Sequence, residues 1–115
     1  MRRDLTPEEL AVDLLPRSPC HVQVAAVLSD NHGVFSWGWN HQYKHAEVHA
    51  INRANPRRLE GSTITVAGKR VKSGNSVFAC PCDQGCMQLL LSKGIKCIRF
   101  RDKHYNWQQL IIGDN

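Results

Sequence analysis

The stretch that decides the fold of this chain is Lys44-His45-Ala46-Glu47-Val48-His49-Ala50-Ile51. It predicts the opening of a helix that begins near His45. Asn55-Pro56 ends this helix, because a residue that precedes proline disfavours the helical conformation. In the first turn, an imidazole and a carboxylate stand two residues apart, on His45 and Glu47. We expect both side chains to belong to one site.

A second stretch, Cys80-Pro81-Cys82-Asp83-Gln84-Gly85-Cys86, supplies thiols. In a reducing compartment, three cysteines within seven positions indicate a metal site or a reactive site rather than a disulfide framework. Cys82 and Cys86 are four residues apart, so at the start of a helix they project from the same side. Pro81 fits a helix start, where free N–H groups and the positive end of the dipole favour thiolate.

Together the two stretches contain the side chains of a catalytic zinc site. Such a site needs three protein ligands and one open position for water. We predict His45, Cys82 and Cys86 as the ligands of one Zn²⁺ ion and Glu47 as the catalytic residue, which carries a proton between the water and the substrate. Cys80 remains the alternative thiol ligand.

The segments around these stretches predict an α/β domain. A capping box at Thr6-Pro7-Glu8-Glu9 begins a first helix. The predicted strands are residues 21–28, 34–39, 62–67 and 95–100, together with the tail 105–112, whose periodicity also fits a short helix. The first two form a hairpin, and the fourth is parallel to the third because a helix intervenes. This order predicts a three-layer α/β/α sandwich with a mixed five-strand sheet, in one domain over residues 1–115.

Two details of this arrangement concern glycine and charge. Gly38, inside the second strand, predicts a close approach of another part of the backbone. Residues 68–75 predict a basic, exposed loop that leaves the third strand. Between residues 53 and 103 there are eleven Lys and Arg, and the net charge of the chain is +5. This concentration of basic residues in one half of the chain fits either a phosphate-bearing partner or a solvated basic surface.

The composition excludes several classes of protein. No apolar run approaches the roughly 20 residues of a membrane helix, so we expect no membrane partner. The polar N-terminal segment lacks the apolar region of a signal peptide, and we expect a cytoplasmic location. At 115 residues the chain is long enough for one hydrophobic core.

His45-Ala46-Glu47, followed by Pro81-Cys82 and Cys86, resembles the cytidine deaminase superfamily. The similarity is greatest to the branch of deoxycytidylate and tRNA adenosine deaminases, which use His as the first ligand. Gly38-Trp39-Asn40 resembles the family's Gly-x-Asn after the second strand, and residues 92–96 resemble the segment after the cysteine helix. The chain departs from the family in having three residues between the two thiols, where the family has two, and in its 68–75 insertion.

The resemblance implies hydrolytic, zinc-dependent deamination of a cytosine base in a free nucleoside or nucleotide, such as cytidine or deoxycytidylate. It implies a contact between Asn40 and the substrate sugar. We expect Ala46, Trp39 and His49 to be further substrate-side residues. It also implies a homo-oligomer.

Two other functions stay open at this point. The same chemistry on single-stranded DNA or RNA is favoured by the positive charge and by aromatic side chains that could stack on bases. A zinc-stabilised nucleic-acid-binding module without catalysis would need a fourth ligand, such as Cys80 or His49. That arrangement would leave Glu47 without a role.

Overall fold

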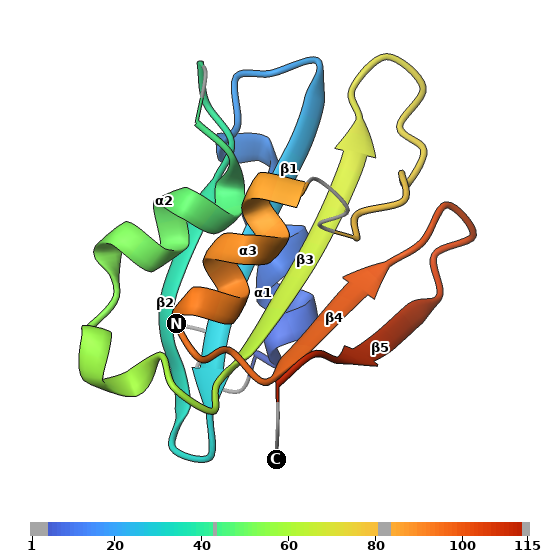
Figure 1. Cartoon of the computed structure of the whole chain (residues 1–115). Coiled ribbons are helices and arrows are strands. Elements are labelled where there is room, and N and C mark those ends of the chain that lie inside the picture. Colours follow the sequence, from blue (N-terminus) through green and yellow to red (C-terminus); the bar gives the residue numbers. More distant parts are fainter. Residues whose placement is uncertain (1–4, 43, 81–83, 114–115) are drawn as a thin grey trace.

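The computed structural model describes residues 5–42, 44–80 and 84–113, and its helices lie on both faces of one five-stranded sheet (Figure 1). The helices are α1 (Pro7–Leu14), α2 (Ala46–Arg53) and α3 (Gln84–Ser92). The strands are β1 (Val22–Asp30), β2 (Gly33–Trp39), β3 (Thr63–Arg70), β4 (Cys97–Arg101) and β5 (Trp107–Ile111). Short 3-10 turns, Leu15–Arg17 and Pro56–Arg58, follow α1 and α2.

The sheet is mixed, with the strand order β2-β1-β3-β4-β5. β3 and β4 are parallel, and α3 lies in the connection between them. The pairs β1–β2, β1–β3 and β4–β5 are antiparallel. The α/β fold with a mixed five-strand sheet is therefore confirmed. The tail, which the sequence left open between strand and helix, is the edge strand β5.

The two faces of the sheet bury separate apolar clusters, because successive side chains of a strand point to opposite faces. On one face, Ala26 and Leu28 of β1 pack with residues of α2 and α3, including Ile51 and Leu90. On the other face, Ala25 and Val27 pack with residues of α1 and the turn after it. The helices thus form one layer on each side of the sheet, which gives the three-layer arrangement.

The helix ends follow the sequence signals. In α1, the N–H of Glu9 donates to Oγ1 of Thr6 at 3.1 Å, and the N–H of Thr6 donates to the Glu9 carboxylate at 3.0 Å. This pair is the predicted capping box. α2 begins directly after His45, whose backbone is extended, and ends at Arg53, before Pro56.

Gly38 lets α2 lie directly against β2. A Cβ at this position would lie 2.6 Å from the backbone nitrogen of Ala50 and 2.8 Å from Cβ of His49. Both distances are too short for real contacts, so a side chain here would displace the helix. The predicted close approach is confirmed, and it fixes the distance between α2 and the sheet.

The prediction that the chain leaves the sheet at Gly68 is wrong by three residues. β3 continues to Arg70 and pairs with β1 down to Val22. Glycine and charged residues are weak strand formers, but here pairing with a long neighbouring strand outweighs local preference. The chain then turns back, and the N–H of Val77 donates to the carbonyl of Gly68 at 3.1 Å. Residues 70–75 are exposed, as expected for the remainder of the loop.

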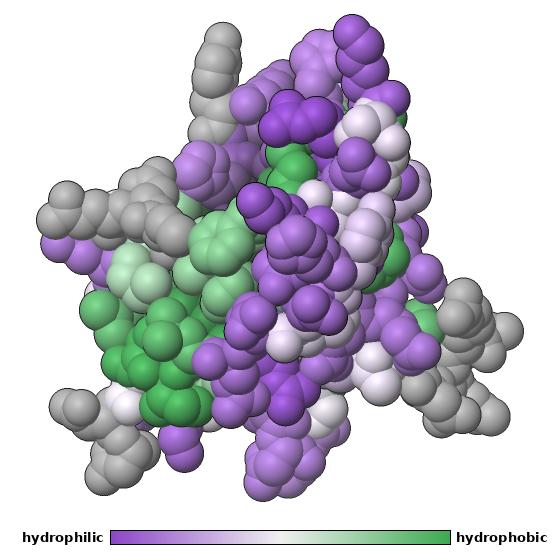
Figure 2. Space-filling model, turned by 90° about the vertical axis from the view of Figure 1, so that its right-hand side faces the viewer, coloured by the Kyte–Doolittle hydropathy of each residue, from purple (hydrophilic) through white to green (hydrophobic). Residues whose placement is uncertain are grey.

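The β4–β5 side of the molecule carries both hydrophilic and apolar surface (Figure 2). Leu110 of β5 pairs with Ile98 of β4, so its side chain lies on the face that carries α3, yet it is 43% exposed. Leu91 on α3 is exposed as well. The layer of helices therefore leaves β5 incompletely covered. None of the helices described reaches the length and hydropathy of a bilayer-crossing segment.

Candidate active site

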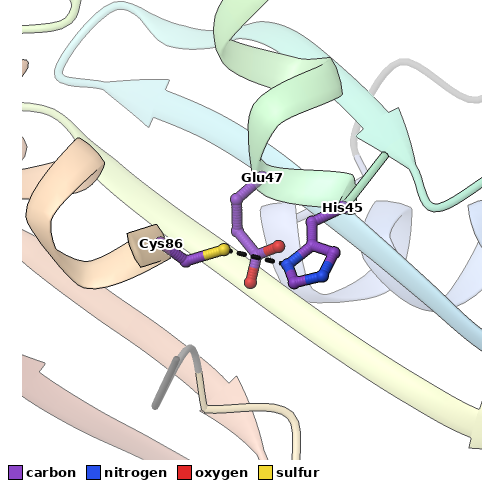
Figure 3. Close-up of side chains that lie close together, drawn as sticks. All are labelled: His45, Glu47 and Cys86. Carbon is purple, nitrogen blue, oxygen red and sulfur yellow. Dashed lines mark hydrogen bonds between the residues drawn. The ribbon is translucent and has the colours of Figure 1, made fainter. Parts of the chain in front are cut away.

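Three side chains from the first turns of α2 and α3 point toward one another at one end of the sheet (Figure 3). Nδ1 of His45 lies 2.9 Å from Sγ of Cys86. His45, Glu47 and Cys86 each offer one ligand atom, and these atoms lie within 4.8 Å of one another. His45 and Cys86 are 41 positions apart in the sequence. Tertiary packing therefore brings the two sequence stretches together as predicted.

The environment of this group favours a metal ion. Glu47 and Cys86 are each only 6% exposed. Imidazole nitrogen, thiolate sulfur and carboxylate oxygen are the donors that zinc takes in proteins. All three come from helix starts, where the positive end of the dipole favours the anionic forms of a thiol and a carboxyl. The group is positioned to bind a metal ion, and its donors fit zinc.

Cys80 and Cys82 are the other two cysteines of the cluster that the sequence offers as zinc ligands. Cys82, the third predicted ligand, lies outside the described residues. Cys80 is half-buried and lines the cavity beside Cys86. The choice between them as the third ligand stays a prediction in favour of Cys82.

A cavity of about 320 Å³ opens onto the metal-binding group. Its lining consists of Val22, Val24, Asn40, His45, Ala46, Glu47, Val77, Phe78, Ala79, Cys80 and Cys86. Most of these side chains are apolar. Asn40 lies directly after the last residue of β2, and His45 and Glu47 lie at the start of α2. An apolar pocket with a few convergent polar groups is the usual form of a small-molecule site.

Phe78 lines this cavity and was not among the site residues predicted from the sequence. It lies at the cavity with 56% of its surface exposed, and its ring meets that of Phe100 edge to face, with centroids 5.1 Å apart. An exposed aromatic ring beside a cavity can stack on a base. Its position two residues before Cys80 was the available signal, because a segment that leads directly into a ligand cluster tends to line the same site.

Asn40, predicted to contact the sugar, lines the cavity while its amide is held from behind. Its Oδ1 accepts from the Ser18 hydroxyl at 2.6 Å and from the N–H of Val24 at 2.8 Å. Its Nδ2 donates to the carbonyl of Val22 at 2.9 Å. These bonds immobilise the amide at the end of β2 and leave one Nδ2–H for another partner.

Ala46 is the first residue of α2, is 1% exposed and lines the cavity. Its small side chain also belongs to the apolar cluster on the face of α2 and α3. This placement agrees with the predicted substrate-side position, and the contact itself stays a prediction.

Trp39 and His49 instead pack β2 against α2. The N–H of Trp39 donates to Nδ1 of His49 at 3.1 Å, and the two rings meet edge to face at 4.8 Å. Burial, followed by the charges of His41 and Arg53, lowers the pKa of His49, which favours the neutral ring that this hydrogen bond requires. Among the described residues, neither side chain belongs to the cavity lining. Their predicted substrate contacts gain no support from this packing.

The known proteins that are similar to this chain are of two kinds, a family described by its zinc-binding region and solved structures of low sequence identity. The family model of the cytidine and deoxycytidylate deaminase zinc-binding region matches residues 2–101. None of the curated proteins matches the chain. Two solved structures of RibD from Acinetobacter baumannii are similar at 18% sequence identity. Form 1 has a TM-score of 0.63 and covers 84% of this chain, and form 2 has a TM-score of 0.48 and covers 69%.

The similarity to form 1 concerns the fold alone, because the identity is low. This chain spans 27% of the RibD chain in form 1 and 21% in form 2. The family model, in contrast, covers the helix starts that carry His45, Glu47 and Cys86, and it describes a zinc-binding deaminase region. The chain belongs to the cytidine and deoxycytidylate deaminase family defined by this zinc-binding region.

Proposed function

We propose that this protein catalyses the zinc-dependent hydrolytic deamination of a cytosine base in a free nucleoside or nucleotide, such as cytidine or deoxycytidylate. The observation that carries the proposal is the convergence of His45, Glu47 and Cys86 on a cavity that Asn40 also lines. This arrangement supports a site in which ligands, a proton carrier and a substrate contact lie around one space.

His45 and Cys86, with Cys82 as the proposed third ligand, would hold the zinc ion. When bound, zinc would supply the nucleophile by lowering the pKa of a water molecule to about 7. The protein has to position the base and move protons. Glu47 is the described carboxylate that lies within this group and lines the cavity.

Glu47 would act as the proton carrier. Its carboxylate would accept a first proton from the attacking water and pass it to the ring nitrogen next to the amino-bearing carbon. It would then take the second proton from the hydroxyl now on that carbon and deliver it to the departing amino group. One water is consumed, and ammonia and a uracil base are formed. Because each proton passes on to the product before the next is taken up, one carboxylate is sufficient. The burial of Glu47 shields this transfer from bulk water.

The size and polarity of the cavity support a small substrate. Its volume of about 320 Å³ lies at the lower end of the range of roughly 300–1,000 Å³ that is typical of small-molecule sites. The valine side chains and Phe78 offer apolar surface to a base, and Asn40 offers a hydrogen-bond donor. A single nucleoside matches these features.

A single strand of DNA or RNA is the second candidate substrate. It is favoured by the exposed ring of Phe78 at the cavity and by the basic turn that precedes it, with Arg70 and Lys72 exposed. A stacking side chain next to cations is the usual combination for single-stranded nucleic acid. Binding of this kind weakens steeply with salt, whereas binding of an uncharged nucleoside does not.

The test is a substrate panel with the purified full chain. We expect about one zinc per chain and ammonia release from cytidine, deoxycytidine or their monophosphates. An oligonucleotide containing cytosine distinguishes the second candidate, whose activity should fall steeply between 50 and 200 mM salt. Adenosine and guanine are controls for the base. A zinc-loaded chain that releases no ammonia from any cytosine compound would contradict the proposal.

A further inference from the structure

The amide of Asn40 can adopt one orientation. Two backbone groups of β1 face it, the N–H of Val24 at Oδ1 and the carbonyl of Val22 at Nδ2. A reversed amide would place its NH₂ against the N–H of Val24 and its oxygen against the carbonyl of Val22. Both contacts would be repulsive, so the backbone alone determines which end of the amide is the oxygen.

Ser18 determines what this oriented amide can still bind. A carbonyl oxygen has two lone pairs, and the N–H of Val24 occupies one of them. The Ser18 hydroxyl donates to the same Oδ1 at 2.6 Å and occupies the other. The remaining capacity of the side chain is a single Nδ2–H, which has no hydrogen-bond partner among the described residues. Toward the cavity, Asn40 is therefore a donor and not an acceptor.

The Ser18 hydroxyl is itself fixed. Ser18 is 3% exposed and lies in the connection between α1 and β1. Its Oγ accepts from the N–H of Cys20 at 3.2 Å, so its only hydrogen is free to point at Asn40. Its own N–H donates to the carbonyl of Leu15, the first residue of the turn after α1. Ser18 lies behind Asn40 and is not part of the described cavity lining.

We propose that Ser18 is a positioning residue that makes Asn40 a pure hydrogen-bond donor toward the substrate. The inference rests on the proposed function and refines its specificity. The matching ligand group is a hydrogen-bond acceptor, such as a hydroxyl oxygen of the nucleoside sugar. Without Ser18, the second lone pair of Oδ1 is open to water or to a donor, and the preference for an acceptor decreases.

The test measures binding without turnover. Cytidine is titrated calorimetrically into the zinc-loaded full chain carrying Glu47→Gln, alone and combined with Ser18→Ala, Asn40→Ala or both. We expect Ser18→Ala to weaken cytidine binding about three- to tenfold, because the Asn40 amide loses one of the neutral hydrogen bonds that hold it toward the ligand. In the Asn40→Ala background, Ser18→Ala should have no further effect, because the two residues act as one unit.

A second cycle changes the ligand instead of Asn40. With 2′,3′-dideoxycytidine, which lacks the 2′- and 3′-hydroxyls of the sugar, the penalty of Ser18→Ala should disappear. This cycle decides the question if Asn40→Ala does not fold. Ser62→Ala is the matched control, since Ser62 is 0% exposed and its hydroxyl also donates at 2.6 Å, to the carbonyl of Leu59. We expect it to lower the melting temperature and leave cytidine affinity unchanged.

Several results would overturn the inference. They are an equal penalty of Ser18→Ala for both ligands, an additive penalty in the Asn40→Ala background, an equal loss with Ser62→Ala, or no binding of cytidine by the parent. Failure of the proposed function has another signature. In that case the chain with Glu47 intact releases no ammonia, while the binding cycles can still show that Ser18 acts through Asn40.

Discussion

The two faces of the sheet are built alike and used differently. Each buries alternate residues of the same strands under helices, and each has its own apolar cluster. The helix α1 begins close to Thr63 and Cys97, where β3 and β4 begin. The helices α2 and α3 begin at the other end of the sheet, near Val77 and the end of β3. The candidate site lies on the face of α2 and α3.

This difference shows that helix direction, more than burial, determines where the chemistry is placed. The start of a helix offers free N–H groups and a positive dipole end, which favour a thiolate and a carboxylate. In α/β sheets, ligands bind beyond the carboxyl ends of the strands. Of the helices in the described part of the chain, α2 and α3 present their starts there. The same kind of substitution should therefore have unequal effects on the two faces.

The largest contrast is expected between two buried cysteines. Cys86→Ala should remove a zinc ligand, so that zinc content falls from about one per chain to near zero and turnover is lost. Cys97→Ala is the control, because Cys97 is 7% exposed and lies on the α1 face. It should retain zinc and activity. Zinc content by atomic spectroscopy, with ammonia release, measures both, and full zinc content in Cys86→Ala would contradict the assigned site.

Next in size is the effect of the buried carboxylate. Glu47→Gln should retain zinc and lower the turnover rate by about 10²–10⁴-fold, the usual contribution of general acid–base catalysis. Glu8→Gln removes a carboxylate from α1, where Glu8 pairs with Arg99 at 2.6 Å, and should leave turnover near the wild-type rate. Steady-state ammonia release compares the two. Equal rates for Glu47→Gln and the wild type would remove the proposed mechanism.

A third comparison uses two buried leucines of the two clusters. Leu14→Ala in α1 and Leu90→Ala in α3 should each lower the free energy of unfolding by about 2–5 kcal/mol, because each leaves a cavity in a packed core. Leu90 lies one turn beyond Cys86, so its replacement should also weaken zinc binding. Chemical denaturation and zinc titration measure the two effects. Equal loss of zinc affinity in both variants would show that the faces are not independent.

The smallest effect concerns an ion pair at the end of the sheet away from the cavity. Arg58 bonds Asp30 at 2.7 Å and, with the N–H of His32, lowers the pKa of that carboxyl from 3.8 to about 2. Because the folded pKa lies below the unfolded value, the stabilisation is present above about pH 4 and is lost as the pH falls toward 2. Asp30→Asn should therefore lower the melting temperature slightly at pH 7.

The difference between Asp30→Asn and the wild type should narrow as the pH decreases from 4 to 2. It should also narrow with added salt, because the pair is near the surface. Turnover at pH 7 should not change. A difference in melting temperature that stays constant over this pH range would show that the ion pair contributes nothing measurable.

The parts of the site that were predictable are those with a local or chemical signature. His45 and Glu47 stand in one helix turn, and Cys86 belongs to a cysteine cluster whose chemistry calls for an imidazole partner. Phe78 was missed because nothing in its own apolar segment distinguishes a cavity wall from core, and its position two residues before Cys80 was the one signal available. The start of the loop was predicted at Gly68, three residues too early, for a related reason. The pairing of residues 68–70 with β1 is a property of the whole sheet and has no local signal in the sequence.

The sequence by itself determined the starts of α1 and α2, the hairpin, the close approach at Gly38 and the pairing of His45 and Glu47 with a thiol of the cysteine cluster, because capping, periodicity and donor chemistry act over a few residues. Only the tertiary structure decided which face of the sheet receives the site, how large its cavity is, and that Ser18 holds Asn40 across 22 positions of sequence. Those properties depend on strand pairing and helix direction, which arise from packing between distant segments.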